Sequence, residues 1–205
     1  MKEKEVVEEE PASEAVVATA DLEAGKSLFT TCIACHGDQG HGNKELGAPM
    51  LVNQEDWYIE RQLANFQKGI RGADPKDERG KQMAAMAQTL VDEAAIKNVV
   101  GYIKSLSEAK PESTIEANIE NGKQFYNAIC GTCHGPKAKG NKSLNAPRLA
   151  GVDDWFLADQ YKKFRDGIRG VHEEDTYGAQ MKMMSTMLET DEAINDVMAY
   201  IQSIE

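Results

Sequence analysis

The sequence predicts an all-α protein built from two tandem copies of one small domain, related by internal duplication. Three observations predict this fold class. The 205-residue chain matches itself when it is shifted by 98 residues. Its apolar residues recur every three or four positions, as on one face of a helix. No stretch alternates apolar and polar residues as a half-buried strand would.

The self-match runs without a gap from Cys32 to Ile103 of the first copy. A period of this length corresponds to a whole small domain, whereas solenoid repeats are about 20 to 50 residues long. We therefore expect this domain organisation: an acidic tail or linker at 1–20, an N-terminal domain at 21–107, a linker at 108–114 and a C-terminal domain at 115–205.

The acidic tail does not resemble a secretion signal, because glutamates dominate it and it has no hydrophobic core. No apolar stretch of the chain approaches the roughly 18–20 residues that a membrane span needs. The net charge of −11 argues against nucleic acid as a partner, since binding there depends on phosphate neutralisation. The same charge favours a partner with a basic docking patch, or it serves solubility alone.

Each copy contains two apolar stripes with helical spacing. The central stripe of the first copy is Ile59, Leu63, Phe66 and Ile70, and the final stripe begins at Ile96. Asp92 and Thr190 stand at equivalent positions just ahead of the two final stripes. Both residue types are good N-caps, so we expect the last helix of each domain to begin there.

All four cysteines lie in two C-x-x-C-H motifs, and this spacing is the attachment signature of haem c. Two thiols on one helical turn can each form a thioether, and the histidine that follows can bind the iron. A thioredoxin-like redox pair would not need the histidine. A separation of 98 residues argues against one zinc site shared by the two motifs. A disulfide would give the histidine no role. The predicted attachment residues are Cys32, Cys35, His36, Cys130, Cys133 and His134.

From these motifs, the sequence resembles the class I c-type cytochromes, and in particular the dihaem cytochrome c4 family. The resemblance covers about residues 21–205. It implies the class I cytochrome c fold in each half, with an N-terminal helix, the haem motif, a G-N-x-x-x-x-A-P loop, a central helix, an axial methionine and a C-terminal helix. It also implies two covalently bound haem c groups, through Cys32/Cys35 and Cys130/Cys133.

The sixth iron ligand is expected to be a methionine, which raises the reduction potential of a haem. Only the pairs Met83/Met181 and Met86/Met184 persist under the 98-residue shift. The family pattern, with the ligand seven residues before a leucine, selects Met83 and Met181, and the second pair stays as the alternative. Met183, Met187 and Met198 are interpreted as gap-filling core residues.

The resemblance also suggests supporting roles. The carbonyls of Pro49 and Pro147 would accept the second N–H of each histidine, unless those prolines only form a loop turn. The aromatic pairs Phe29/Tyr102 and Tyr126/Tyr200 would join the first and last helices, at crossings made close by Gly25 and Gly122.

The sequence leaves open the roles of two tryptophans, two arginines and two histidines. Trp57 and Trp155 would contact a haem or simply fill the core. Arg71 and Arg169 would pair with haem propionates or, more commonly for arginine, lie exposed. The unrepeated His41 and His172 were expected to be solvated loop residues.

The predicted function is a single-electron carrier that acts on no substrate itself. Its expected partners are redox proteins: a quinol-oxidising complex or another donor, and a terminal oxidase or reductase as acceptor. Haem c attachment follows export in bacteria, so a periplasmic location is expected, with a possible peripheral or tethered association with a membrane complex. The alternatives are a dihaem peroxidase or reductase, a haem-based sensor, and the haem region of a membrane-bound electron-transfer subunit.

Overall fold

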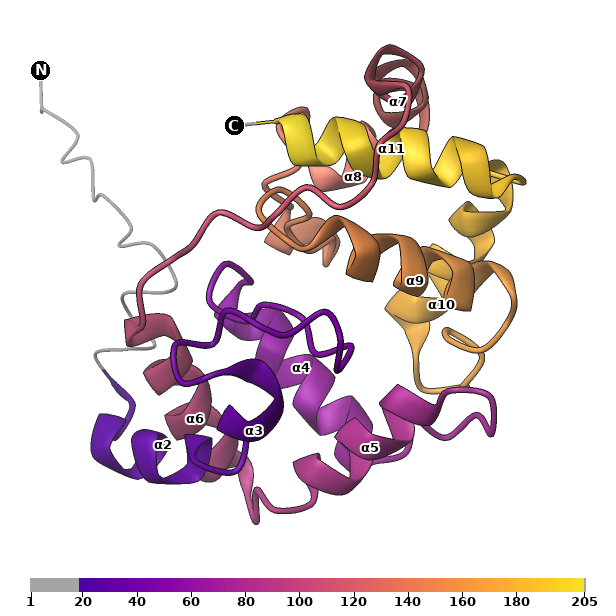
Figure 1. The fold of residues 1–205 in the computed structure, drawn as a ribbon. Coiled ribbons are helices and arrows are strands. Elements are labelled where there is room, and N and C mark those ends of the chain that lie inside the picture. Colours follow the sequence, from indigo (N-terminus) through magenta and orange to yellow (C-terminus); the bar gives the residue numbers. More distant parts are fainter. Residues whose placement is uncertain (1–18, 205) are drawn as a thin grey trace, which may run out of the picture.

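The computed structural model describes residues 19–204, so residues 1–18 of the predicted tail at 1–20 lie outside the described residues. Within 19–204 the protein is helical, with two isolated β-bridges and no strand, which confirms the all-α prediction. The N-terminal domain contains α2 (Leu22–Phe29), α3 (Ile33–His36), α4 (Asp56–Gln67), α5 (Glu78–Ala87) and α6 (Glu93–Ser105). The C-terminal domain contains α7 (Ile119–Phe125), η1 (Tyr126–Cys130), α8 (Gly131–His134), η2 (Lys142–Leu144), α9 (Asp154–Arg165), α10 (Thr176–Met184), η3 (Ser185–Met187) and α11 (Asp191–Ser203). Figure 1 shows these two groups of helices as separate bodies joined by an extended segment.

The last helix of each domain begins where the sequence predicts. The Asp92 carboxylate accepts a hydrogen bond from the amide of Ala95, at 2.8 Å, and so caps α6. The Thr190 hydroxyl does the same for α11 through the amide of Ala193, at 3.1 Å. Each cap satisfies a backbone donor that the first helical turn leaves unpaired.

The central helices are shorter than their apolar stripes suggest. Helix α4 ends at Gln67, so Ile70, the last member of the stripe, lies beyond it. Gly69 adopts a φ of +69°, and the amide of Ile70 donates to the carbonyl of Asn65 at 2.9 Å. This left-handed glycine with a backward hydrogen bond is the Schellman arrangement that stops a helix.

The first and last helices of each domain cross in close contact. A Cβ added to Gly25 would lie 2.1 Å from the carbonyl oxygen of Asn98, and one added to Gly122 would lie 1.9 Å from that of Asp196. Beside each crossing, an aromatic pair packs at a centroid distance of 5.4 Å, which confirms the predicted contacts of Phe29 with Tyr102 and of Tyr126 with Tyr200.

Replacing Gly122 with alanine is therefore expected to destabilise the C-terminal domain by about 3 kcal/mol or more, the upper end of the cost of overpacking. On an open helix surface the same change would stabilise the protein by roughly 1 kcal/mol through helix propensity. Denaturant unfolding measures the difference, and Lys123→Ala, at the exposed neighbouring position, is the control. Equal midpoints for both variants would contradict the close crossing.

A π-helical turn absorbs a one-residue difference between the two copies. Cys130 follows Tyr126 by four positions, whereas Cys32 follows Phe29 by three. The extra residue lies in η1, directly before the second C-x-x-C-H motif. Such turns commonly accommodate insertions at functional sites. Here the turn keeps both the aromatic contact and the cysteine motif in place despite the different spacing.

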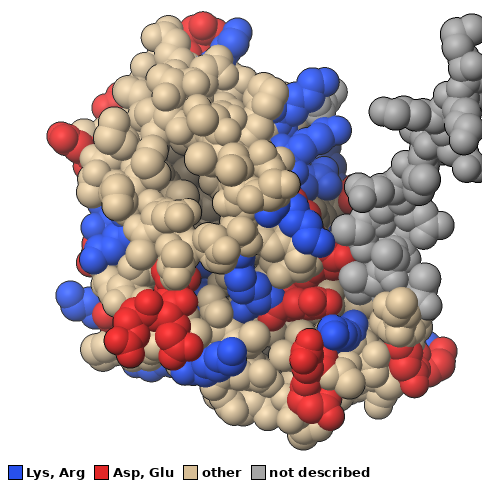
Figure 2. Space-filling view, turned by 180° about the vertical axis from the view of Figure 1, so that it is seen from behind, with Lys and Arg blue, Asp and Glu red and all other residues tan. Residues whose placement is uncertain are grey.

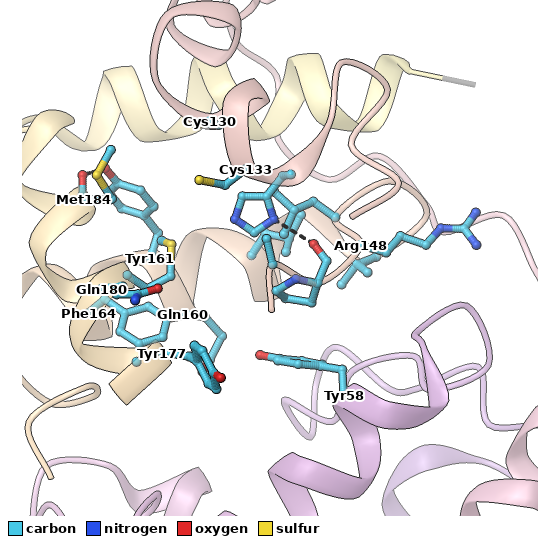
Figure 3. A pocket seen from close by; sticks show the side chains of 18 of the residues that line it. Tyr58, Cys130, Cys133, Arg148, Gln160, Tyr161, Phe164, Tyr177, Gln180 and Met184 are labelled. Atoms are coloured by element: carbon cyan, nitrogen blue, oxygen red, sulfur yellow. Dashed lines mark hydrogen bonds between the residues drawn. The ribbon is translucent and has the colours of Figure 1, made fainter. Parts of the chain in front are cut away.

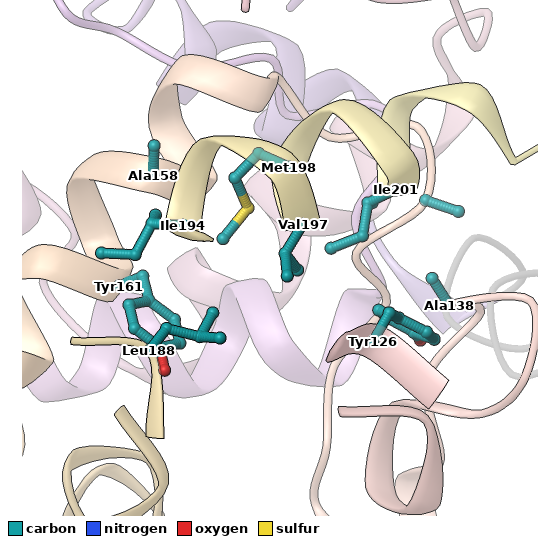
Figure 4. Packing of buried hydrophobic residues seen from close by; sticks show 10 residues of the cluster. Tyr126, Ala138, Ala158, Tyr161, Leu188, Ile194, Val197, Met198 and Ile201 are labelled. Atoms are coloured by element: carbon teal, nitrogen blue, oxygen red, sulfur yellow. The ribbon is translucent and has the colours of Figure 1, made fainter. Parts of the chain in front are cut away.

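The core of the C-terminal domain is formed around α11 (Figure 4). Ile194, Val197, Met198 and Ile201 of this helix are all 4% exposed or less. They pack with buried side chains from the other elements, among them Tyr126 and Leu188. The N-terminal domain has a matching core cluster in which α6 is central.

Several polar contacts join the N-terminal domain to loops and to helix α9 of the C-terminal domain. The side chain of Asn53 donates to the carbonyl of Gly151 at 2.7 Å, and Arg61 donates to the side chain of Asn145 at 2.9 Å. An ion pair also crosses the junction: the Lys163 ammonium lies 2.9 Å from the carboxylate of Asp77, and both side chains are largely buried.

This ion pair should contribute to stability in a pH-dependent way. Burial alone would raise the pKa of Asp77, but the Lys163 ammonium and the Gly80 amide lower it overall. A carboxyl whose pKa is lower in the folded state stabilises the protein above its ordinary pKa, and this contribution is lost as the pH falls through the folded-state value.

We therefore expect Lys163→Gln to lower stability at neutral pH and to make little difference once Asp77 is protonated. Urea unfolding at neutral pH and at about pH 2, well below the ordinary pKa of about 3.9 for aspartate, measures this. The control is Lys162→Gln, whose lysine pairs with the exposed Asp191 within its own domain. A stability loss of the same size at both pH values would contradict this role of the pair.

Candidate functional site

The two C-x-x-C-H motifs each form one short helix whose cysteines lie a turn apart. Cys32 and Cys130 precede α3 and α8 and are partly buried, while Cys35 and Cys133 are exposed. All four thiols are free. Burial raises the pKa of Cys130 to about 12. Redox-active dithiols need the opposite, a lowered thiol pKa, so this environment argues against the thioredoxin-like alternative.

The two histidines of the motifs are buried and held in one orientation. His36 is 5% exposed and donates through Nδ1 to the carbonyl of Pro49 at 2.8 Å. His134 is 7% exposed and donates to the carbonyl of Pro147 at 2.7 Å, the bond drawn as a dashed line in Figure 3. The predicted proline contacts are confirmed. Since Nδ1 carries the proton in this bond, Nε2 keeps a lone pair that can bind a metal.

Both histidines also favour the neutral form. Burial lowers the pKa of His36 and of His134, and the hydrogen bond to the proline carbonyl opposes this effect only in part. A neutral imidazole with a free Nε2 is the form in which histidine binds metals.

Each proline carbonyl is held in place by the preceding loop. Asn43 and Ala48 exchange two backbone hydrogen bonds, at 2.7 and 3.0 Å, and Asn141 and Ala146 do the same. Gly42 makes the loop possible: its φ is +82°, and a Cβ there would lie 2.6 Å from the amide of Met50. The G-N-x-x-x-x-A-P motif thus folds as a closed loop that presents the proline carbonyl to the histidine.

A cavity in the C-terminal domain brings the predicted site residues together. Its lining includes Cys130, Cys133, His134 and both candidate methionines, Met181 and Met184. Figure 3 shows Met184 and Cys133 on the walls of this space, with Tyr161 and Phe164 beneath them. From outside, Figure 2 shows a hollow in a largely uncharged face of the C-terminal domain, with acidic and basic side chains gathered below it. A mostly apolar cavity with a few polar groups is typical of a cofactor site.

The cavity does not distinguish the two methionine pairs. Met181 is partly buried and packs against the domain core, whereas Met184 is 39% exposed. In the N-terminal domain Met83 is likewise partly buried and Met86 is 39% exposed. The first pair is the more buried one, and its assignment as iron ligands stays a prediction.

The other methionines divide differently from the prediction. Met198 is 4% exposed and belongs to the core, as expected. Met183 and Met187 are 72% and 56% exposed, so they fill no gap in the core. Met183 lies in α10 and Met187 in η3, and both side chains face solvent.

The expectation that Arg71 and Arg169 lie exposed is wrong, because both lie at the junction between the domains and bind residues there. Arg71 bonds Gln62 of its own domain and Gln160 of the other, each at 2.7 Å. Arg169 bonds the same two glutamines, at 2.8 Å each, and the hydroxyl of Tyr58 at 3.0 Å. Gln62 and Gln160 are themselves equivalent under the 98-residue shift.

These arginines keep unused hydrogen-bonding capacity. The Nε atoms of Arg71 and Arg169 are buried and have no partner. Burial lowers the pKa of Arg71 to about 9, and the positive charge of Arg169 adds to that effect. Arg169 lines the cavity, as do Tyr58, Arg61 and Gln62 from the N-terminal domain. Sequence reasoning missed those three residues, because no pattern along the chain signals a contact between domains.

The remaining candidates lie apart from the cavity. Trp57 stacks against Arg61 at 4.9 Å, and neither Trp57 nor Trp155 lines the cavity. His41 is exposed, as expected, while His172 is partly buried and accepts the amide of Glu174. No group of three His, Cys, Asp or Glu side chains within residues 19–204 could hold a metal ion, so the shared zinc site has no support.

Comparison with known proteins gives a consistent set of similarities. The Cytochrome c family model matches residues 22–107 and 119–205. A cbb3-type cytochrome c oxidase subunit FixP from Azorhizobium caulinodans is 38% identical over 130 residues, 61% of this chain and 42% of that protein. Cytochrome c4 of Azotobacter vinelandii is 26% identical over 166 residues, 74% of this chain and 76% of that one.

The fold is also found among solved structures. Reduced cytochrome c4 from Pseudomonas stutzeri superposes with a TM-score of 0.70 at 23% identity and covers 91% of this chain and all of that one. The chain spans less than half of the length of the FixP subunit.

Proposed function

The chain belongs to the cytochrome c family and contains two tandem domains of it. From that premise we propose that it holds two haem groups covalently and uses them to carry single electrons to a terminal oxidase. The attachment residues are Cys32, Cys35, Cys130 and Cys133. His36 with Met83, and His134 with Met181, would hold the two irons. The domains have the boundaries 21–107 and 115–205, with the linker at 108–114.

One observation gives the proposal its main support. In both domains a buried histidine follows two free thiols and donates from Nδ1, which leaves Nε2 unprotonated. A bound haem supplies the reversible one-electron chemistry, while the protein sets its ligands and surroundings. The proline carbonyls fix the histidine rings, and the apolar walls exclude water from the site. The methionines provide a second, softer ligand type.

The arginines at the domain junction are suited to bind the carboxylate groups of a haem. Buried guanidinium groups without a carboxylate partner favour an anion, and Arg71 and Arg169 each have an unpaired Nε to offer it. Because Arg169 lines the cavity together with Tyr58 of the other domain, we propose that these two residues would bind a carboxylate group of the cofactor.

The acceptor is proposed to be an oxidase because the FixP relative is named as an oxidase subunit. None of the helices within residues 19–204 has the length and apolarity of a membrane span. A periplasmic location, with docking or tethering to a membrane complex, is part of the proposal.

The test is a haem count combined with a reactivity assay. Mass spectrometry of the purified chain should show two covalently retained haems, and a redox titration should show two one-electron steps without a substrate. Carbon monoxide and peroxide should react slowly, because a histidine and a methionine would already hold each iron. Rapid reaction at one haem would favour the peroxidase, reductase or sensor alternatives, and a chain without covalent haem would refute the proposal.

A further inference from the structure

The peptide groups that follow Pro49 and Pro147 each form hydrogen bonds through both the carbonyl and the amide. The carbonyl of the first, Pro49 O, accepts the N–H of His36, and its amide, Met50 N, donates to a carboxylate oxygen of Asp153 at 2.7 Å. In the other domain, Pro147 O accepts from His134, and the next amide donates to a carboxylate at the same distance. That amide belongs to Arg148, and the carboxylate is that of Glu55.

Both carboxylates come from the opposite domain. Glu55 stands at the start of α4 and reaches the C-terminal domain, whereas Asp153 stands at the start of α9 and reaches the N-terminal domain. The two residues are equivalent under the 98-residue shift, and so are Met50 and Arg148. The duplication has thus produced a reciprocal pair of contacts across the junction.

Both contacts are shielded from water, so each carboxylate has a strong electrostatic effect on the groups next to it. Asp153 is 9% exposed and the Met50 residue that it binds is 8% exposed; Glu55 is partly buried. An amide–carboxylate bond is charge-assisted, and hydrogen bonds in series polarise one another in a region of low dielectric. A negative charge on the amide side makes the carbonyl a stronger acceptor for the histidine N–H.

We propose that Asp153 and Glu55 are positioning residues that each tune the haem site of the other domain, through one peptide group and one histidine. This inference rests on the proposed function, in which His36 and His134 bind iron. A stronger hydrogen bond from Nδ1 makes the imidazole a better electron donor to the metal and so stabilises the oxidised iron. Each carboxylate therefore lowers the reduction potential of the haem in the opposite domain.

The two sites should differ in the size of the effect. Each carboxylate has the next aspartate as a neighbour, Asp56 beside Glu55 and Asp154 beside Asp153. Glu55 also lies near the positive charges of Arg148 and Lys104, which offset its own charge, whereas Asp153 has no such cation among its charged neighbours in the described residues. The less compensated Asp153 should have the larger influence. The N-terminal haem site is thus the more strongly affected one.

The test compares Asp153→Asn and Glu55→Gln, which remove the charge and keep an oxygen acceptor. Haem potentials are measured by spectroelectrochemistry on the full holoprotein, and the Nδ1–H resonances of His36 and His134 are measured by NMR in the reduced state. Asp153→Asn should raise the potential of the N-terminal haem and move the His36 resonance upfield, with little change at the other haem. Glu55→Gln should do the reverse, with a smaller shift.

The control is Asp56→Asn, which removes a buried carboxylate adjacent to Glu55 that bonds the amide of Trp57 within its own helix. It should leave the His134 resonance in place. Equal shifts at both haems, or a shift confined to the haem of the mutated domain, would overturn the proposal. If Asp153→Asn does not fold, the reciprocal Glu55→Gln variant and the charge-retaining Asp153→Glu variant decide, since the latter should keep a potential near that of the unmodified protein.

Failure of this coupling is distinguishable from failure of the proposed function. A haem count of two with both methionine ligands intact, and no crossed shift in the variants, refutes the coupling alone. A chain that retains no covalent haem refutes the proposed function, and the coupling with it.

Discussion

A chain in which Cys130 and Cys133 are both replaced by alanine is expected to retain one covalent haem in place of two. The thioether bonds are the only covalent attachment that the motif provides, so their loss removes the group from the C-terminal domain. The N-terminal domain has its own motif and its own core cluster, and should remain loaded. Mass spectrometry under denaturing conditions measures the number of retained haems directly.

Two further variants make this expectation specific. Replacing Cys32 and Cys35 should also leave one haem, now in the C-terminal domain, and replacing all four cysteines should leave none. The control is Thr132→Ala, which changes a residue between the two cysteines of the second motif and should leave both haems attached. Loss of both haems from either double variant would contradict independent attachment by the two motifs.

Replacing Met181 with alanine is expected to cause the largest change in reduction potential. Methionine opposite histidine raises the potential of a haem, and axial ligands set potentials over a range of roughly 0.8 V. The potential of the C-terminal haem should therefore fall by a substantial part of that range, and the haem should become able to bind carbon monoxide. The far-red charge-transfer band of methionine-ligated ferric haem should fall to half.

The matched control is Met184→Ala, three residues further along the same helix and on the wall of the same cavity. It should keep both methionine-ligated haems and change the potential little. The reverse result, with Met184 essential and Met181 dispensable, would assign the ligand to the second methionine pair. The equivalent comparison of Met83→Ala with Met86→Ala tests the N-terminal domain.

The sequence by itself determined the helical fold class, the duplication and the candidate attachment residues. These features depend on local order along the chain: the period of the apolar residues, the N-caps Asp92 and Thr190, and the fixed spacing of the cysteines and histidine. The resemblance to the class I c-type cytochromes added the prolines whose carbonyls accept hydrogen bonds from the two histidines.

Only the tertiary structure decided which residues of one domain act on the other. Arg71 and Arg169 were expected to lie exposed, as arginines commonly do, yet each bonds a glutamine of its own domain and the equivalent glutamine across the junction. The bond from the amide of Met50 to Asp153 joins residues 103 positions apart. Periodicity and motif spacing describe contacts within one helix or loop, whereas these contacts arise from how two folded domains pack. For that reason the cross-domain carboxylates became visible only in three dimensions.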